Sequence, residues 1–178
     1  MTHRTLVLGG ARSGKSAYAE HLLPPDTPVT YVATARRDPA DAEWEARIAT
    51  HIARRPAAWH TVEPADLAAL ITTATDQILL VDDLATWLTG VLDDTSAWEG
   101  SLAAAERRVD DLVAAVIRCR VRLVLVSAEV GLGVVPETRS GRLFRDELGS
   151  LNARLAWVCE ESVLLVAGLP VSLKAPRR

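Results

Sequence analysis

The sequence predicts an α/β protein of three layers, in which a mostly parallel central sheet lies between two layers of helices. Two observations predict this fold. Five short segments rich in Val, Leu and Ile alternate along the chain with longer segments of helical periodicity. The short segments are apolar on both faces instead of alternating with polar residues, which is typical of strands that helices cover on both sides.

The predicted strands are short apolar runs. They span residues 5–8, 29–33, 77–81, 121–127 and 163–167, and residues 59–62 and 171–173 are candidates for edge strands. No apolar run approaches the ~18–20 residues that a helix needs to cross a bilayer. We therefore expect a sheet built from these runs and no membrane span.

Helical candidates connect the strands. They span residues 16–23, 41–53, 64–73, 84–92, 96–118 and 137–157, and several open with Asp, Ser, Glu or Pro, which are favoured at helix N-termini. In the long central helix, apolar residues recur at three- and four-residue steps: Trp98, Leu102, Ala105, Val109, Leu112 and Val116. This stripe predicts a packing surface.

Length and composition indicate one ordinary globular domain that spans residues 1–178. Hydrophobic residues make up 49% of the chain and charged residues 24%, which excludes disorder as the main state. The formal net charge is −3 and the sequence pI is about 5.8, which excludes the broad basic field that collects nucleic acid. Any charge that binds phosphate must therefore be local.

The cysteines and the N-terminal residues indicate the cellular compartment in which the protein resides. Cys119 and Cys159 have no CxxC spacing, which favours reduced packing thiols over a disulfide framework or a zinc site. Residues 1–10 lack the apolar segment and the small-residue cleavage site of a secretion signal. We expect the protein to reside in the cytoplasm.

The strongest chemical signal follows the first predicted strand and precedes the first predicted helix. It is a complete Walker A pattern, formed by Gly9, Gly10, Ala11, Arg12, Ser13, Gly14, Lys15 and Ser16. Glycines let backbone N–H groups point around a triphosphate, Lys15 can reach the outer phosphates, and Ser16 offers a hydroxyl to Mg²⁺. The alternative is a glycine-rich turn without function. The motif and its flanks narrow the fold class to a P-loop NTPase-like (RecA-like) fold that binds nucleotide phosphates.

A P-loop site also needs a carboxylate at the end of a neighbouring buried strand, where it helps to hold Mg²⁺. Asp82 is the first polar residue after residues 78–81 and is our candidate, together with Ser16. Asp83 is the alternate, although it could instead cap the helix that begins at residue 84. These residues do not identify the reaction, because a fold does not determine chemistry.

A histidine and two arginines share one side of a predicted helix. Arg47 lies four residues before His51, and Arg54 lies three residues after it. Nearby cations disfavour protonation of an imidazole, so a ring nitrogen could attack phosphorus or act as a base near neutral pH. On spacing alone, the simpler interpretation is favoured, namely a half-buried histidine beside solvated arginines.

Further distinctive segments follow the phosphate loop along nearly the whole chain. They are residues 31–34 (YVAT), the RIxxH pattern from Arg47 to His51, residues 55–56, Trp59, Glu63, Asp82 with residues 84–88, residues 129–137 (EVGLGVVPE), residues 144–146 (FRD), Asn152, and residues 167–170 (AGLP) with Leu173 and Lys174. Together they resemble the bifunctional adenosylcobinamide kinase and adenosylcobinamide-phosphate guanylyltransferase family of cobalamin (vitamin B12) biosynthesis. The EVGLGVVPE loop combined with the RIxxH helix is specific to this family.

The resemblance implies two activities at one nucleotide site. In the first, ATP or GTP phosphorylates the hydroxyl of the aminopropanol arm of adenosylcobinamide. In the second, the guanylyl group of GTP passes to a histidine and then to that phosphate, which gives adenosylcobinamide-GDP and pyrophosphate. Matched to this sequence, His51 would be the guanylylated residue, and Lys15, Ser16 and Asp82 would neutralise phosphate charge and place Mg²⁺ in both steps.

The resemblance also implies further nucleotide contacts. They fall on Ala33, Thr34 and Ala35 after the second strand, on Ile52, Ala53, Arg54 and Arg55 after the histidine, and on Glu63. Glu63 is the candidate guanine reader, because a carboxylate can accept hydrogen bonds from the adjacent N1–H and N2–H₂ donors of guanine, a pair that adenine lacks. Glu63 could instead cap a helix that begins at Pro64.

The expected ligands are the corrinoid, ATP or GTP, and Mg²⁺. By analogy with the family, we expect a homotrimer. From the net charge and the short apolar runs, we expect no nucleic-acid partner and no membrane span. Residues 129–139 are the natural neighbour of the incoming corrinoid. Two other functions stay open: a small-molecule P-loop kinase without guanylyl transfer, and a non-catalytic module that senses GTP.

Overall fold

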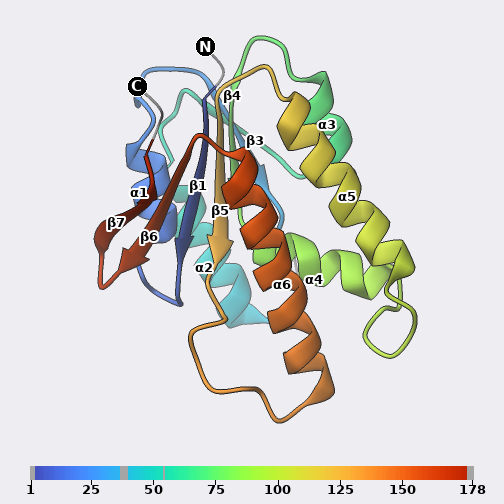
Figure 1. The fold of residues 1–178 in the computed structure, drawn as a ribbon. Coiled ribbons are helices and arrows are strands. Elements are labelled where there is room, and N and C mark those ends of the chain that lie inside the picture. Colours follow the sequence, from blue (N-terminus) through green and yellow to red (C-terminus); the bar gives the residue numbers. More distant parts are fainter. Residues whose placement is uncertain (1–2, 37–39, 54, 176–178) are drawn as a thin grey trace.

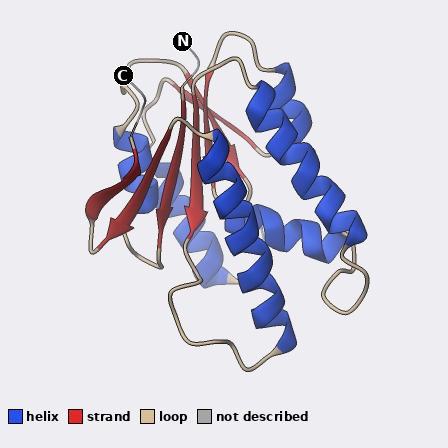
Figure 2. Ribbon diagram, in the orientation of Figure 1, coloured by secondary structure: helices blue, strands red, loops and turns tan. Residues whose placement is uncertain are grey.

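A computed structural model describes residues 3–36, 40–53 and 55–175 of the chain. A twisted sheet forms its centre, with helices on both faces (Figure 1). Figure 2, in the same orientation, separates the strands from the helical layers that flank them. The predicted α/β class and its three layers are confirmed.

The sheet in the described part of the chain has seven strands in the order β3-β2-β4-β5-β1-β6-β7. Their bounds are β1 Arg4–Gly9, β2 Val29–Ala33, β3 Trp59–Val62, β4 Ile78–Asp82, β5 Leu123–Ala128, β6 Glu161–Val166 and β7 Leu169–Lys174. All neighbouring pairs are parallel except β6 and β7, which form an antiparallel hairpin at one edge. The carboxyl ends of the parallel strands therefore meet at one edge of the sheet.

Successive side chains of the buried inner strands enter different halves of the core. In β1, Leu6 and Leu8 belong to the larger buried cluster, and Val7 belongs to the smaller cluster on the other face. All three are at most 5% exposed. Because both faces of β1 are buried at residues 6–8, all three of these residues are apolar, which explains the continuous apolar runs in the sequence.

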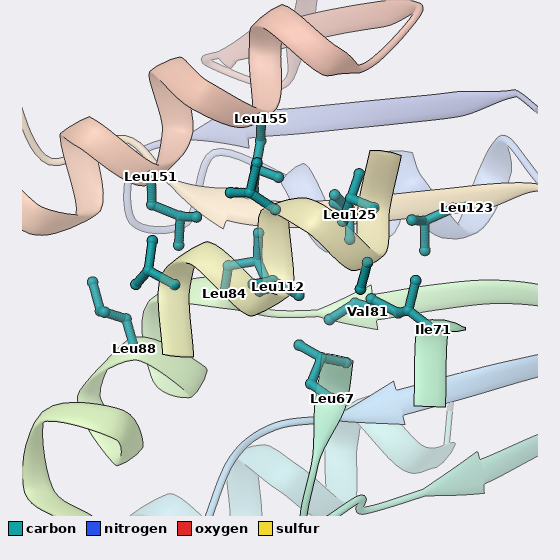
Figure 3. Close-up of a cluster of buried hydrophobic side chains, with 14 of the residues drawn as sticks. Leu67, Ile71, Val81, Leu84, Leu88, Leu112, Leu123, Leu125, Leu151 and Leu155 are labelled. Atoms are coloured by element: carbon teal, nitrogen blue, oxygen red, sulfur yellow. The ribbon is translucent and has the colours of Figure 1, made fainter. Parts of the chain in front are cut away.

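The helices connect the strands and cover both faces. Their bounds are α1 Lys15–His21, α2 Ala42–Ala53, α3 Leu67–Thr73, α4 Leu84–Asp94, α5 Ala103–Arg118 and α6 Arg139–Val158. The helices α3 to α6 contribute to the larger cluster, whose members include Leu67, Leu88, Leu112 and Leu155 (Figure 3). Helix α1 supplies Ala19 to the smaller cluster. None of the described side chains of α2 belongs to either cluster.

The predicted strands and both candidate edge strands are present, with ends that differ from the prediction by at most two residues. Residues 29–33 and 59–62 begin and end where predicted. In the described part of the chain, no helix has the length and apolar character that a bilayer crossing requires.

The predicted helix 96–118 is wrong at its start, because α5 begins at Ala103. Ser96 takes a positive φ of 51°, which ends the preceding helix, and residues 95–99 form turns. Trp98 lies in these turns, where its Nε1 donates to Asp93 Oδ1 at 2.6 Å. From Ala105 onward the predicted stripe is buried. Trp98 therefore has the sequence spacing of a helical residue, but it lies in a turn, where the hydrogen bond to Asp93 holds its side chain.

The predicted helix 64–73 begins at Leu67. Asp66 is its N-cap, and the Asp66 carboxylate accepts a hydrogen bond from the amide of Ala69 at 3.0 Å. A carboxylate that satisfies a free amide favours a helix start at this position over Pro64.

Candidate nucleotide site

A pocket lies where the parallel strands end, between α1, α2 and the ends of β2, β3 and β4. Its cavity volume is about 180 Å³. It is lined by Lys15, Ser16, Tyr31, Ala33, Ala35, Ile48, Ile52, Arg55, Thr61, Glu63, Asp82, Asp83 and Thr86. The fold thus gathers predicted residues from the phosphate loop, from β2, from the end of α2 and from β4.

The phosphate loop turns from the end of β1 into α1. Gly14 precedes the helix with a φ of 88°, which glycine adopts without strain, and Arg12 has a φ of 55°. Gly9 allows a close approach, because a Cβ there would lie 2.3 Å from Ser13 Oγ. Ser13 Oγ is buried and has no hydrogen-bond partner among the described residues. This turn makes Lys15 the first residue of α1.

Two predicted loop residues lie on its open side. A Cβ on Gly10 would meet no atom within 4 Å, and Ala11 is exposed. Their surroundings leave room for phosphate oxygens to approach backbone amides.

Three side chains from α1, β2 and β4 form a chain of hydrogen bonds. Ser16 Oγ donates to Asp82 Oδ1 at 3.1 Å, and the Tyr31 hydroxyl donates to Asp82 Oδ2 at 2.5 Å. Tyr31 is only 1% exposed. Burial and the charge of Asp82 raise the pKa of Tyr31, so the phenol keeps the proton that it donates. Both oxygens of the predicted metal carboxylate are therefore held.

The neighbouring aspartate has a different role. Asp83 is the N-cap of α4, and its carboxylate accepts a hydrogen bond from the Thr86 amide at 2.9 Å. The Thr34 hydroxyl donates to the Asp83 carbonyl at 2.6 Å. Thr34 therefore braces the start of α4 with its side chain, whereas Ala33 and Ala35 line the pocket.

The opposite wall of the pocket comes from α2 and the segment after it. Ile48 and Ile52 line the pocket, and Arg55 lies over the ring of Tyr31 with its Cζ 3.6 Å from the centroid. Arg55 Nη1 donates to Thr61 Oγ1 at 2.8 Å. Arg55 Nε is buried and has no hydrogen-bond partner among the described residues. The Arg55 side chain thus lines the pocket with a positive charge, which suits phosphate.

For three predicted residues of this wall, the structure describes only the backbone or does not describe the residue. His51 and Ala53 belong to α2 by their backbone, and their side chains lie outside the described part of the structure. Arg54 lies outside the described residues altogether. The predicted position of the imidazole therefore stays a prediction.

Glu63 follows the end of β3 and is exposed at the rim of the pocket. The alternative that it caps a helix is wrong, because Asp66 caps α3. The Glu63 carboxylate thus stands at a position from which it could contact a base.

A groove of about 650 Å³ adjoins the pocket and shares Ala33, Ala35, Glu63 and Thr86 with it. Across this groove, Arg36 donates to Asp94 Oδ2 at 2.6 Å and to the Gly90 carbonyl at 3.3 Å. A Cβ on Gly90 would lie 3.1 Å from Arg36 Nε. Glycine at this position therefore lets Arg36 lie against α4.

Tyr31, Thr61 and Thr86 line the pocket although the sequence assigned none of them a role there, and Tyr31 stood out only as part of the YVAT segment. The only signal in the sequence is that a tyrosine within a buried strand needs a partner for its hydroxyl. Which partner it finds depends on how the strands pair, which local patterns do not specify.

The residues present fit Mg²⁺. The described residues hold no cluster of three or more His, Cys, Asp or Glu side chains that could enclose a metal ion. Ser16 and Asp82 instead offer one hydroxyl and one carboxylate beside Lys15. Mg²⁺ binds in this way, because it completes its coordination with waters and nucleotide phosphate oxygens.

Comparison with known families decides the family. A family model described as cobinamide kinase / cobinamide phosphate guanyltransferase matches residues 5–173 of the chain. The chain belongs to this family. The resemblance found in the sequence is therefore confirmed.

Curated relatives of this cobinamide kinase / cobinamide phosphate guanyltransferase family member match it over nearly the whole length of both chains. The bifunctional adenosylcobalamin biosynthesis protein CobU of Salmonella typhimurium is 43% identical, over 95% of this chain and 98% of the relative. CobP of Pseudomonas aeruginosa, described in the same words, is 44% identical over 96% and 97%. CobU of Escherichia coli is 38% identical over 95% and 98%.

The fold of this family member is also similar to a solved ATPase from the type III secretion system of pathogenic bacteria. The TM-score is 0.51 at 10% sequence identity, and the match covers 96% of this chain and 56% of that chain. This chain thus spans little more than half of the ATPase. The likeness concerns the fold alone, and it supports the P-loop NTPase-like class.

Proposed function

We propose that this protein phosphorylates adenosylcobinamide with ATP or GTP and then transfers GMP from GTP, through His51, to give adenosylcobinamide-GDP. The observation that carries the proposal is a single pocket that joins the phosphate loop to α2. Lys15 and Ser16 line one wall, and Ile48 and Ile52 of the helix that contains His51 line the other. Family membership supplies the reaction class.

In the kinase reaction, the hydroxyl oxygen of the corrinoid attacks the γ-phosphorus of the nucleotide, and the bond to the bridging oxygen breaks. Lys15 would neutralise charge on the phosphates, while Ser16 and Asp82 would hold Mg²⁺. When bound, Mg²⁺ neutralises the charge that develops on the phosphate oxygens. The Ser16–Asp82 contact of 3.1 Å supports this assignment.

In the transferase reaction, an imidazole nitrogen of His51 attacks the α-phosphorus of GTP, and pyrophosphate leaves. A phosphate oxygen of the phosphorylated corrinoid then displaces the histidine, which regenerates the enzyme. His51 follows Ile48 by three residues, nearly one helical turn, and Ile48 lines the pocket. The position of the Arg55 side chain in the lining of the pocket supports a role in offsetting phosphate charge.

Glu63 would select guanine over adenine in the transferase reaction. Its carboxylate would accept hydrogen bonds from N1–H and N2–H₂ of guanine, a pair of donors that adenine does not offer. Its place at the rim shared by the pocket and the groove supports a contact with the base rather than with phosphates.

We also propose a cytoplasmic homotrimer, by analogy with the family. Apolar side chains on the outer hairpin support an assembly, because Leu169, Val171 and Leu173 are 69%, 46% and 55% exposed. Light scattering coupled to size-exclusion chromatography would give the mass of the assembly, and a monomer mass would contradict the trimer.

Labelling with GTP tests the two-step reaction. Incubation with GTP labelled at the α-phosphate should leave an acid-labile label on the wild-type protein, because a phosphorus–nitrogen bond to histidine is acid-labile. His51→Ala should abolish labelling and adenosylcobinamide-GDP formation, while phosphorylation of adenosylcobinamide continues. A wild-type protein that phosphorylates the corrinoid without becoming labelled would support the kinase-only alternative. GTP binding without any corrinoid product would support the GTP-sensing alternative.

A further inference from the structure

Tyr31 occupies a position between the two walls of the nucleotide pocket. It is on β2, between β3 and β4, and its side chain faces the smaller core cluster. Its hydroxyl contacts Asp82, and its ring face contacts Arg55. These contacts come from strand pairing and not from the Walker motifs.

We propose that Tyr31 is a positioning residue that acts through two separate parts: its hydroxyl orients Asp82 for the metal ion, and its ring holds the Arg55 guanidinium toward the nucleotide phosphates. This proposal rests on the proposed function for the identity of the nucleotide and of the metal. It assigns a role to a residue that neither contacts the reacting atoms nor belongs to a phosphate-binding motif.

The hydroxyl limits how Asp82 can turn. A carboxylate on a strand end can rotate about its terminal bond unless both oxygens are held. Tyr31 holds Oδ2 at 2.5 Å, which leaves Oδ1 directed toward Ser16 Oγ at 3.1 Å. The partners that orient metal-binding side chains typically contribute 10–100-fold to metal affinity, about the size of effect that we expect here.

The ring limits where Arg55 can lie. The guanidinium stacks 3.6 Å from the ring centroid and is tied at one nitrogen to Thr61 Oγ1 at 2.8 Å. Trp59 lies beside the same ring, with the two centroids 6.4 Å apart, and is 9% exposed. Tyr31 is therefore fixed by packing, and a fixed ring preorganises the arginine that rests on it.

Two variants test separately the contact of Tyr31 with Asp82 and the placement of Arg55 on its ring. Tyr31→Phe removes the hydroxyl and keeps the ring, and Thr61→Val removes the second hold on Arg55 and leaves Tyr31 intact. Mn²⁺ serves as the metal probe, and its affinity for the protein in the presence of GTP is measured by electron paramagnetic resonance. Metal-free GTP affinity is measured by calorimetry, and the kinase rate is measured as a function of Mg²⁺ concentration.

Tyr31→Phe should weaken Mn²⁺ binding about 10–100-fold, leave metal-free GTP affinity unchanged, and lose kinase rate that high Mg²⁺ restores. Thr61→Val should weaken metal-free GTP binding about fivefold and leave Mn²⁺ affinity unchanged, because it removes one hydrogen bond to a charged group. Tyr18→Phe is the matched control, since the Tyr18 ring packs against the same core cluster. It should change none of these quantities.

Several outcomes would overturn the inference. Unchanged Mn²⁺ affinity in Tyr31→Phe would remove the orienting role of the hydroxyl. Equal loss of Mn²⁺ affinity in Thr61→Val, or in the control, would show a general loosening of the pocket instead of two separate roles. A Tyr31→Phe deficit that high Mg²⁺ does not restore would likewise contradict positioning of the metal carboxylate. Failure of the wild-type protein to phosphorylate the corrinoid would instead overturn the proposed function, because the Mn²⁺ measurement does not use that substrate.

Discussion

The two walls of the nucleotide pocket are supported in different ways. The phosphate-loop wall continues β1 and β4, where Leu6, Val7 and Leu80 are completely buried. The α2 wall presents Ile48 and Ile52 to the pocket, Ile52 is 42% exposed, and no described α2 side chain joins the core. Among the described residues, the phosphate-loop wall thus rests on buried strands, whereas the α2 side chains Ile48 and Ile52 face the pocket.

Replacing Lys15 tests whether both reactions depend on the phosphate-loop wall. Lys15→Ala should lower the rates of phosphorylation and of guanylyl transfer together, each by about 10²–10³-fold, because one preorganised donor to the phosphates is lost. Steady-state rates with adenosylcobinamide and with its phosphate measure the two reactions. Loss of one reaction alone would contradict a phosphate wall shared by both.

Hydrogen exchange compares the walls directly. In the free protein, α2 amides should exchange about 100-fold faster than β1 and β4 amides, because local opening exposes little buried surface. GTP should slow exchange in α2 more than in the strands, since a bound ligand stabilises the closed form. Mass spectrometry of peptides that cover residues 42–53 and 78–82 gives the comparison. Protection of α2 equal to that of β4 without nucleotide would contradict it.

Breaking the ion pair between Arg4 and Glu160, at the start of β1, should leave the activity unchanged and cost little stability. Glu160 accepts hydrogen bonds from the Arg4 backbone amide and side chain, at distances of 2.7, 3.1 and 2.5 Å. Glu160→Gln should lower the free energy of unfolding at pH 7 by about 1 kcal/mol or less, because the pair is partly exposed. The kinetic constants should stay unchanged, because the pair lies at the other end of β1 from the phosphate loop.

The pH dependence of this loss gives a second check. The Arg4 guanidinium holds the pKa of Glu160 at about 2, below its ordinary value of 4.5. A carboxylate whose pKa is lower in the folded state than in the unfolded state stabilises the fold at pH values above its unfolded pKa. This stabilisation is lost as the pH falls to the folded pKa. The difference between wild type and Glu160→Gln should therefore be full above pH 4.5 and vanish near pH 2. Denaturant unfolding at several pH values measures it, and a difference that grows on acidification would contradict the assignment.

The strands and the phosphate loop could be predicted from the sequence because their signals are local. Residues 29–33 are buried on both faces and read as one apolar run, and residues 9–16 carry their own turn chemistry. For Asp82 and Asp83, the sequence favoured Asp82 as the metal carboxylate and offered Asp83 as a possible helix cap. The structure confirms that Asp83 caps α4, and the contact of Asp82 with Ser16 supports the metal role, which stays a prediction.

The remaining features depend on contacts between distant parts of the chain. The Tyr31 hydroxyl and Asp82 are 51 residues apart in sequence, and only the pairing of β2 with β4 brings them together. The stacking of Arg55 on Tyr31 likewise follows from the pairing of β2 with β3. The prediction for Trp98 was wrong for the opposite reason. Its local spacing fits a helix, but Trp98 lies in a turn before α5 and donates a hydrogen bond to Asp93.

The burial of both cysteines has a practical consequence for spectroscopy. Cys119 and Cys159 are free and buried, and burial raises the pKa of both thiols, that of Cys159 to about 12. Since thiolates are the species that react with maleimides, the native thiols should stay silent in the folded protein. A spin label or dye could thus be attached at one chosen point, such as Ala49→Cys on the exposed side of α2, without first removing the native cysteines. Such a probe would report how this helix approaches a bound nucleotide in solution.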